Sequence, residues 1–180
     1  YSRIHSRPVL EVMGPRLANT GLLMGLALVL SLAIALPVGI YSALRPHSAS
    51  DYAINFLALA GISVPVFWLA LMLIVIFAVT LNWLPAGGME TIGSEAQGFT
   101  WMLDRARYLV LPVIALSVAS IGGLTRYVRA AMMEVMRQDY IRTARAKGAS
   151  RARVVLLHAL RNAMISVVTI LALSFGTLFS

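Results

Sequence analysis

Four long stretches without a charged residue constrain the fold of this chain more than any other feature. They lie at 17–44, 52–89, 108–125 and 162–180. A helix needs about 17–25 mainly apolar residues to cross the hydrocarbon of a bilayer, and each stretch contains such a run. Charged residues make up 12% of the chain, whereas soluble domains average about 25%. The sequence therefore predicts an all-α polytopic membrane protein.

We expect four membrane spans, at about 19–44, 55–81, 108–131 and 162–180. The third helix is expected to continue out of the membrane towards Met136, and the polar segment 85–107 to form a loop with room for a short surface helix. Proline inside a span breaks the ladder of backbone hydrogen bonds, which a membrane helix tolerates when neighbouring groups take up the freed carbonyl. Bends are therefore expected at three prolines, Pro37, Pro65 and Pro112.

The ends of the chain suggest a fragment. It begins with Tyr1 and ends at Ser180 inside an apolar run. We therefore expect residues 1–180 to form one membrane domain that lacks membrane segments at one or both ends.

The cations are unevenly distributed. Fifteen Lys and Arg against seven Asp and Glu give a net charge of +8, and nine of the cations lie at 126–161. A strongly basic soluble chain would suggest nucleic acid as a partner, but a basic loop between spans is explained by the positive-inside rule. We therefore expect segment 126–161 and the turn at Arg45 to be cytoplasmic, and no nucleic acid to bind.

The sequence lacks the residue patterns that are typical of catalytic or metal-binding sites. The chain has no cysteine, and His5, His47 and His158 lie far apart, so no metal-ligand spacing is present. The segment at Lys147 and Gly148 lacks the first glycine and the spacing of a phosphate-binding loop. We therefore expect no catalytic residue, metal or cofactor. The apolar runs also hold no charged residue of the kind that ion-coupled carriers need, so any uphill transport would take its energy from a partner.

The most informative stretch is 138–161, QDYIRTARAKGASRARVVLLHALR. Residues 140–147 are mostly good helix formers, and Gly148 stands where a left-handed cap would end a short helix. Ser150 stands where an N-cap would start the next helix, which leads into the fourth span. The stretch therefore predicts a helix, a break and a second helix within a cytoplasmic loop at about 134–161.

The short helix has two distinct faces. Tyr140, Ala144 and Gly148 share one face, and Arg142 and Arg145 share another. Small residues permit the close approach of another surface, and arginine pairs with carboxylates through two hydrogen bonds. On the pattern alone, the loop is either a solvated topology signal touching anionic lipid or a docking element for another protein.

The segment DYIRTARAKGASRARVVLLHALRNAMI resembles the cytoplasmic EAA loop of permeases of the binding-protein-dependent ABC importers, specifically the dipeptide and oligopeptide branch. Gly148 matches the glycine of the loop, and Thr143 and Ala144 match its paired small positions. Arg142 stands where the general motif has Glu, and Leu160-Arg161 where it has Leu-Pro; both departures are typical of the peptide branch. The segments RPVLEVMGPRLANT, SVPVFWLALML and LNWLPAGG are also similar to this branch.

The resemblance implies a type I importer fold, with spans two to five of a six-span subunit. It implies a multi-pass protein of the plasma (inner) membrane of a prokaryote that hydrolyses no ATP itself. The implied partners are the lipid bilayer, a related second permease subunit, one or two cytoplasmic ATP-binding subunits and an extracytoplasmic peptide-binding protein. The short helix would then be the coupling helix that docks on the ATPase, through Tyr140, Ile141, Arg142, Thr143, Ala144, Arg145, Ala146, Lys147 and Gly148.

Polar residues inside the spans are candidates for lining a translocation pathway. They are Asn55, Ser63, Ser117, Ser120 and Thr125. Such residues equally serve hydrogen bonds between helices, worth about 0.6 kcal/mol each, so both interpretations stay open.

Three alternatives to a peptide importer permease also remain at this point. One is a nickel-chelate permease of the same branch. Another is an ATP-independent channel whose basic loop only sets topology. The third is a membrane-embedded scaffold or sensor in which Arg142 and Arg145 recruit an acidic partner without transport.

Overall fold

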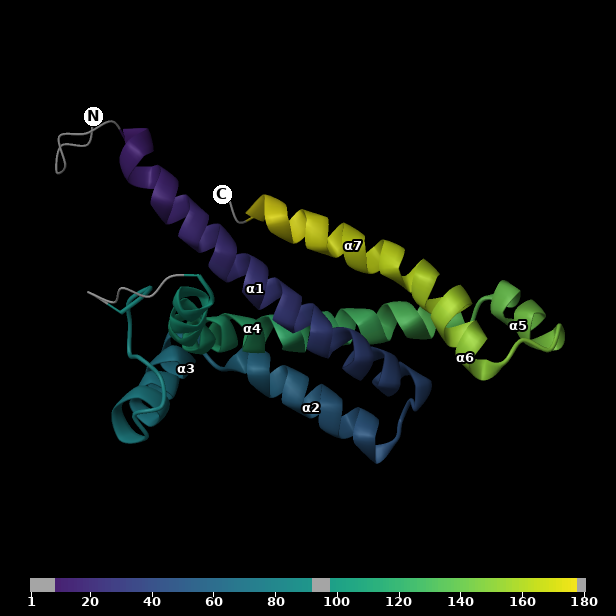
Figure 1. Ribbon diagram of the computed structural model, residues 1–180. Helices are drawn as coiled ribbons and strands as arrows, with labels where there is room; N and C mark the ends of the chain where they lie inside the picture. The colour runs from purple at the N-terminus through teal and green to yellow at the C-terminus, as the bar shows by residue number, and fades with distance from the viewer. Residues whose placement is uncertain (1–8, 92–97, 178–180) are drawn as a thin grey trace. The chain divides into compact units, whose positions relative to one another are not determined.

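The structure is a computed structural model that describes residues 9–91 and 98–177, and every regular element within those residues is helical (Figure 1). In chain order the helices are α1 (Val9–Leu44), α2 (Ala49–Ser63), α3 (Val66–Leu73), the π-helical η1 (Ile74–Thr80), α4 (Phe99–Met136), α5 (Asp139–Ala146), α6 (Arg151–Arg153), the π-helical η2 (Val154–Ala159) and α7 (Leu160–Thr177). Three helical stretches are long and apolar enough to span a membrane, and a fourth if α2 and α3–η1 count as one broken span. The predicted all-α membrane class is confirmed.

Helix boundaries agree with the expected interruption at Pro65 but differ from expectation at the start of α4. The predicted interruption at Pro65 is present, because α2 ends at Ser63 and α3 begins after Pro65, whose carbonyl accepts a hydrogen bond from Leu69 N–H at 3.0 Å. By contrast, α4 already begins at Phe99, inside the segment expected to be a loop. Helices α1 and α4 run through Pro37 and Pro112. The parts of the predicted loop and fourth span at 92–97 and 178–180 lie outside the described residues.

The chain divides into two compact units, and α1 and α4 contribute to both. The first unit comprises residues 1–31 and 64–119. In it, the Ser117 hydroxyl lies 2.6 Å from the Val113 carbonyl oxygen and 3.1 Å from that of Ala27. A small polar residue at the crossing thus lets α1 and α4 approach closely.

The loop before α4 is tied back onto the helix that follows it. Thr91 donates from its backbone N–H and from its hydroxyl to the two carboxylate oxygens of Asp104, both at 2.8 Å. Trp101 Nε1 donates to Glu90 at 2.9 Å. These bonds hold the first turns of α4 against the loop, which explains why the helix starts earlier than the apolar run alone suggests.

The second unit comprises residues 32–63 and 120–180 and contains the main hydrophobic core. The buried side chains of this core come from the end of α1, the end of α4, α5, η2 and α7: Ala43, Val128, Ala131, Met132, Ile141, Val154, Val155, Ala159, Ala163 and Val167. Two glycines allow close helix contacts here. A Cβ at Gly39 would lie 2.8 Å from Val128 Cβ, and one at Gly122 would lie 2.4 Å from the Ala58 carbonyl oxygen.

Candidate functional site

The short helix predicted within the basic loop is present as α5, an eight-residue helix at Asp139–Ala146. It begins after Gln138, whose backbone is extended and whose carbonyl accepts the N–H of Ile141 at 3.1 Å. The predicted range of 140–147 was therefore correct to within one residue at each end.

The predicted break after the short helix is also confirmed. Gly148 has φ +80°, the left-handed conformation that costs glycine no steric strain. Its N–H donates to the Arg145 carbonyl at 2.9 Å, and the N–H of Ala149 donates to that of Ala144 at 3.1 Å, which is the bond pattern of a Schellman cap. The next helix starts at Ser150, whose hydroxyl accepts the N–H of Arg153 at 3.4 Å as an N-cap.

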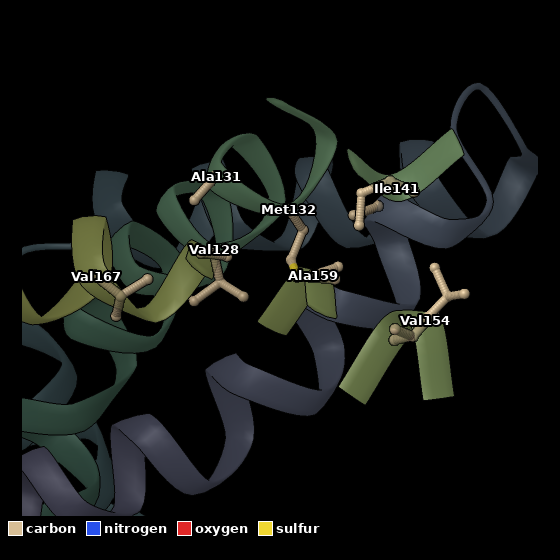
Figure 2. Close-up of a cluster of buried hydrophobic side chains, with 10 residues drawn as sticks. Val128, Ala131, Met132, Ile141, Val154, Ala159 and Val167 are labelled. Atoms are coloured by element: carbon tan, nitrogen blue, oxygen red, sulfur yellow. The ribbon is translucent and has the colours of Figure 1, made fainter. Parts of the chain in front are cut away.

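Ile141 anchors α5 to the core of the second unit. Its side chain is fully buried, and it lies in one cluster with Met132 of α4 and with Val154 and Ala159 of η2 (Figure 2). Ala144, one turn further, packs partly against the same cluster. The side chain of Ile141 is therefore an anchor rather than a contact surface. Ala144 is partly buried against the same core.

The remaining candidate docking residues form an exposed, basic face of α5 and its cap. They are Tyr140, Arg142, Thr143, Arg145, Ala146, Lys147 and Gly148. On this face an ion pair joins Arg142 and Asp139 at 3.6 Å, with both side chains at least 80% exposed. An exposed pair of this kind contributes little stability, so the guanidinium of Arg142 remains available to a partner.

A groove runs beside this face. It has a volume of about 480 Å³, and its lining includes Tyr140, Thr143 and Lys147 from α5 and its cap, and Arg153 and His158 from the following helix. A rigidly anchored helix with a basic face and an adjacent groove is suited to hold a surface element of another protein that carries carboxylates.

The candidate pathway residues are placed differently from one another. Asn55 donates to the Asp51 carbonyl at 2.8 Å and to its carboxylate at 2.9 Å, and Ser63 donates to the Leu59 carbonyl at 2.9 Å. Ser117 is buried within the first unit. Ser63 and Ser120 are exposed, whereas Thr125 is buried and its hydroxyl makes no hydrogen bond within the described part of the chain. Asn55, Ser63 and Ser117 thus serve in hydrogen bonds within the chain, and lining of a pathway stays a prediction.

Sequence reasoning missed an ion pair in the second unit. Arg129 Nε and Nη2 donate to the two carboxylate oxygens of Asp51, both at 2.7 Å. The same carboxylate accepts hydrogen bonds from the Ser42 hydroxyl and from the backbone N–H of His47, the latter at 3.0 Å. Asp51 and Arg129 are 78 residues apart in sequence, and no local pattern predicts their pairing.

The pair also bears on topology. Asp51 follows the turn that joins α1 to α2, and Arg129 lies in the last turns of α4, just before the basic loop. The ion pair therefore places the 45–48 turn at the same end of the helices as the basic loop, as the charge distribution predicts.

Comparison with known proteins identifies the family to which the chain is similar. The family model for the inner membrane component of binding-protein-dependent transport systems matches residues 35–180. The chain is 47% identical over 166 residues to the oligopeptide transport system permease protein AppB of Bacillus subtilis, covering 92% of this chain and 51% of that protein. It is 42% identical over 158 residues to the di/tripeptide transport system permease protein DppB of Pseudomonas aeruginosa, covering 79% of this chain and 46% of that one.

A third relative is the dipeptide transport system permease protein DppB of Alkalihalophilus pseudofirmus, 39% identical over 189 residues, covering 96% of this chain and 56% of that protein. The chain thus spans about half the length of the curated relatives it matches. The family model covers most of the chain, in agreement with the helical spans and the helix-break-helix loop. The chain belongs to the family of inner membrane components of binding-protein-dependent transport systems.

Proposed function

We propose that this chain is part of the permease subunit of an ATP-driven importer of dipeptides or oligopeptides, and that α5 is the helix by which it binds an ATPase subunit. The observation that carries the proposal is the construction of α5. Ile141 fixes the helix in the core shared with α4 and η2, while Arg142 and Arg145 remain exposed. A force applied to the exposed face is therefore transmitted to packed helices rather than absorbed by a loose loop.

Peptides are the substrate class that the relatives support, because the names of three of them specify oligopeptides, di- and tripeptides, and dipeptides. The family description itself names dependence on a binding protein. The proposed assembly therefore contains an extracytoplasmic peptide-binding protein, this permease, a second permease subunit and cytoplasmic ATPase subunits. The chain would form half of the translocation pathway and hydrolyse no ATP.

A charge reversal at Arg145 tests the docking assignment. In the complete permease, coexpressed with its partner subunits, Arg145→Glu places a carboxylate on the exposed face of α5 without disturbing a buried contact. Like charges across an interface cost several kcal/mol, so recovery of the ATPase with the affinity-tagged permease is expected to fall at least about tenfold. Uptake of a labelled dipeptide is expected to fall with it.

Arg161→Glu is the matched control, because Arg161 is also an exposed arginine, at the end of the basic loop, but lies in α7 rather than α5. It is expected to leave recovery of the ATPase unchanged. Full ATPase recovery and full uptake with Arg145→Glu would show that α5 is not the docking helix. Peptide flux in vesicles without ATP would favour a channel, and uptake of a nickel chelate but not of peptides would favour the nickel-chelate alternative.

A further inference from the structure

A second pocket lies in the same unit, between α2 and α4, away from the exposed face of α5. Its volume is about 550 Å³, and its lining includes Asn55 and Ile62 of α2 and Gly123, Arg126, Tyr127 and Arg129 of α4. The two helices touch at Gly122, where a Cβ would meet the Ala58 backbone. At the neighbouring Gly123 a Cβ would meet nothing within 4 Å, so the missing side chain leaves space open beside a close helix contact.

The charges in this pocket are unbalanced. Arg129 is neutralised by Asp51, to which it donates through Nε and Nη2. Arg126 is exposed and makes no ion pair or hydrogen bond with any residue of the described ranges. The pocket lining therefore includes one uncompensated guanidinium, that of Arg126, and also Arg129, whose Nη1 is not used in its pairing with Asp51. Guanidinium groups bind phosphate through paired, charge-assisted hydrogen bonds.

The surface beside the pocket is apolar. On α2, Tyr52, Phe56 and Leu59 are 64%, 71% and 55% exposed. Their spacing of i, i+4 and i+7 puts them on one face of the helix, and that face adjoins the one carrying Asn55 and Ile62. A positive pocket therefore borders a strip of exposed apolar side chains, which is a combination that suits an amphiphile with an anionic head and a hydrocarbon tail.

The pocket also lies at the right level in the membrane. Arg126 directly follows the uncharged run 108–125 and begins the cation-rich segment 126–161. That segment is cytoplasmic by the positive-inside rule. Anionic headgroups are attracted to basic pockets between membrane helices on this side.

We propose that the pocket between α2 and α4 binds an anionic phospholipid. Arg126 is the main contact to the headgroup phosphate, the free Nη1 of Arg129 is a second donor, and the Tyr52, Phe56 and Leu59 strip holds an acyl chain. This site is additional to the proposed docking of an ATPase and does not depend on it.

Native mass spectrometry of the complete permease complex, released from detergent with added lipid, tests the proposal. The probes are dioleoylphosphatidylglycerol and, as the uncharged comparison, dioleoylphosphatidylcholine. An arginine near an anionic membrane surface contributes about 1 kcal/mol, so Arg126→Gln is expected to weaken phosphatidylglycerol binding about fivefold and to leave phosphatidylcholine unchanged. Gly123→Leu, which fills the pocket from an open position, is expected to weaken phosphatidylglycerol binding as well.

The matched control is Arg137→Gln, which removes the same charge from an exposed arginine outside the pocket and is expected to have no effect. A separate titration with inorganic phosphate distinguishes a lipid from a small anion, because the apolar strip contributes only to the lipid. The proposal is overturned if neither Gly123→Leu nor Arg126→Gln reduces phosphatidylglycerol binding, or if phosphate displaces the lipid at equal concentration. It is also overturned if the assembled complex binds no phosphatidylglycerol, which would show that another protein segment covers the pocket. Arg145→Glu is expected to retain the lipid, so this proposal and the docking proposal can fail independently.

Discussion

The contact between α2 and α4 gives the sharpest prediction, because two adjacent glycines of the same helix differ only in what faces them. A Cβ at Gly122 would lie 2.4 Å from the Ala58 carbonyl oxygen and 3.1 Å from Ile62 Cγ1, whereas one at Gly123 would meet nothing within 4 Å. The Ala58 oxygen belongs to a helix backbone and cannot rotate away. Gly122→Ala therefore forces α2 and α4 apart, while Gly123→Ala does not.

The magnitude follows from comparing the two variants. Both gain the same intrinsic preference of alanine over glycine for helix, about 1 kcal/mol, so this gain cancels in the difference. What remains is the cost of overpacking at Gly122, which is typically about 1–3 kcal/mol. Gly122→Ala should therefore be less stable than Gly123→Ala by that amount.

The assay is the apparent melting temperature of the detergent-purified permease, followed by the fraction that survives heating and elutes as a single species on size exclusion. One kcal/mol corresponds to about 2–4 °C for a domain of this size, so Gly122→Ala is expected to melt several degrees below Gly123→Ala. Equal melting temperatures would refute the close approach of α2 to α4 at Gly122.

Two further predictions concern buried groups. Asp51→Ala is expected to lower stability by up to about 3–5 kcal/mol, because Arg129 keeps a charge that has lost its partner; the loss should be at the lower end since the Arg129 side chain is 22% accessible. Thermal melting of Asp51→Ala, Arg129→Ala and the double variant measures the coupling, and additive losses would contradict a direct interaction. Ile141→Ala is expected to cost about 2–5 kcal/mol of core packing and to reduce peptide uptake per ATP hydrolysed, whereas Thr143→Ala on the exposed face should leave stability unchanged; equal stability of the two would refute the anchoring role of Ile141.

The features that were predictable from sequence depend on neighbours in the chain. Gly148 ends a helix because only glycine enters the left-handed region without strain, and Ser150 starts one because its hydroxyl reaches a free N–H of the first turn. Both signals act over a few residues. The helix-break-helix order, the interruption at Pro65 and the end of α4 at Met136 were therefore available from the sequence.

The features that were missed depend on residues brought together by the fold. The pairing of Asp51 with Arg129 joins positions 78 residues apart, each of which stands in sequence beside an apolar run and resembles an ordinary flanking charge. The resemblance implied docking for Ile141 together with its neighbours, and the sequence of an eight-residue helix does not reveal that this side chain is buried in the core. The early start of α4 at Phe99 depends on the hydrogen bonds that Thr91 donates to Asp104 and that Glu90 accepts from Trp101.

The cap at Gly148 and the burial of Ile141 together bear on how α5 would couple a bound partner to the membrane helices. The cap at Gly148 and the restart at Ser150 allow α5 to leave the direction of the spans, but a helix of eight residues is not stable alone in water. Burial of Ile141 between α4 and η2 supplies the missing stability and joins α5 to the helices on both sides of the loop. The exposed arginines of α5, Arg142 and Arg145, are then free to bind a partner, and we expect a displacement of α5 to move both helices together. On this argument the anchoring residue, rather than the number of cations, determines whether a basic loop can transmit movement.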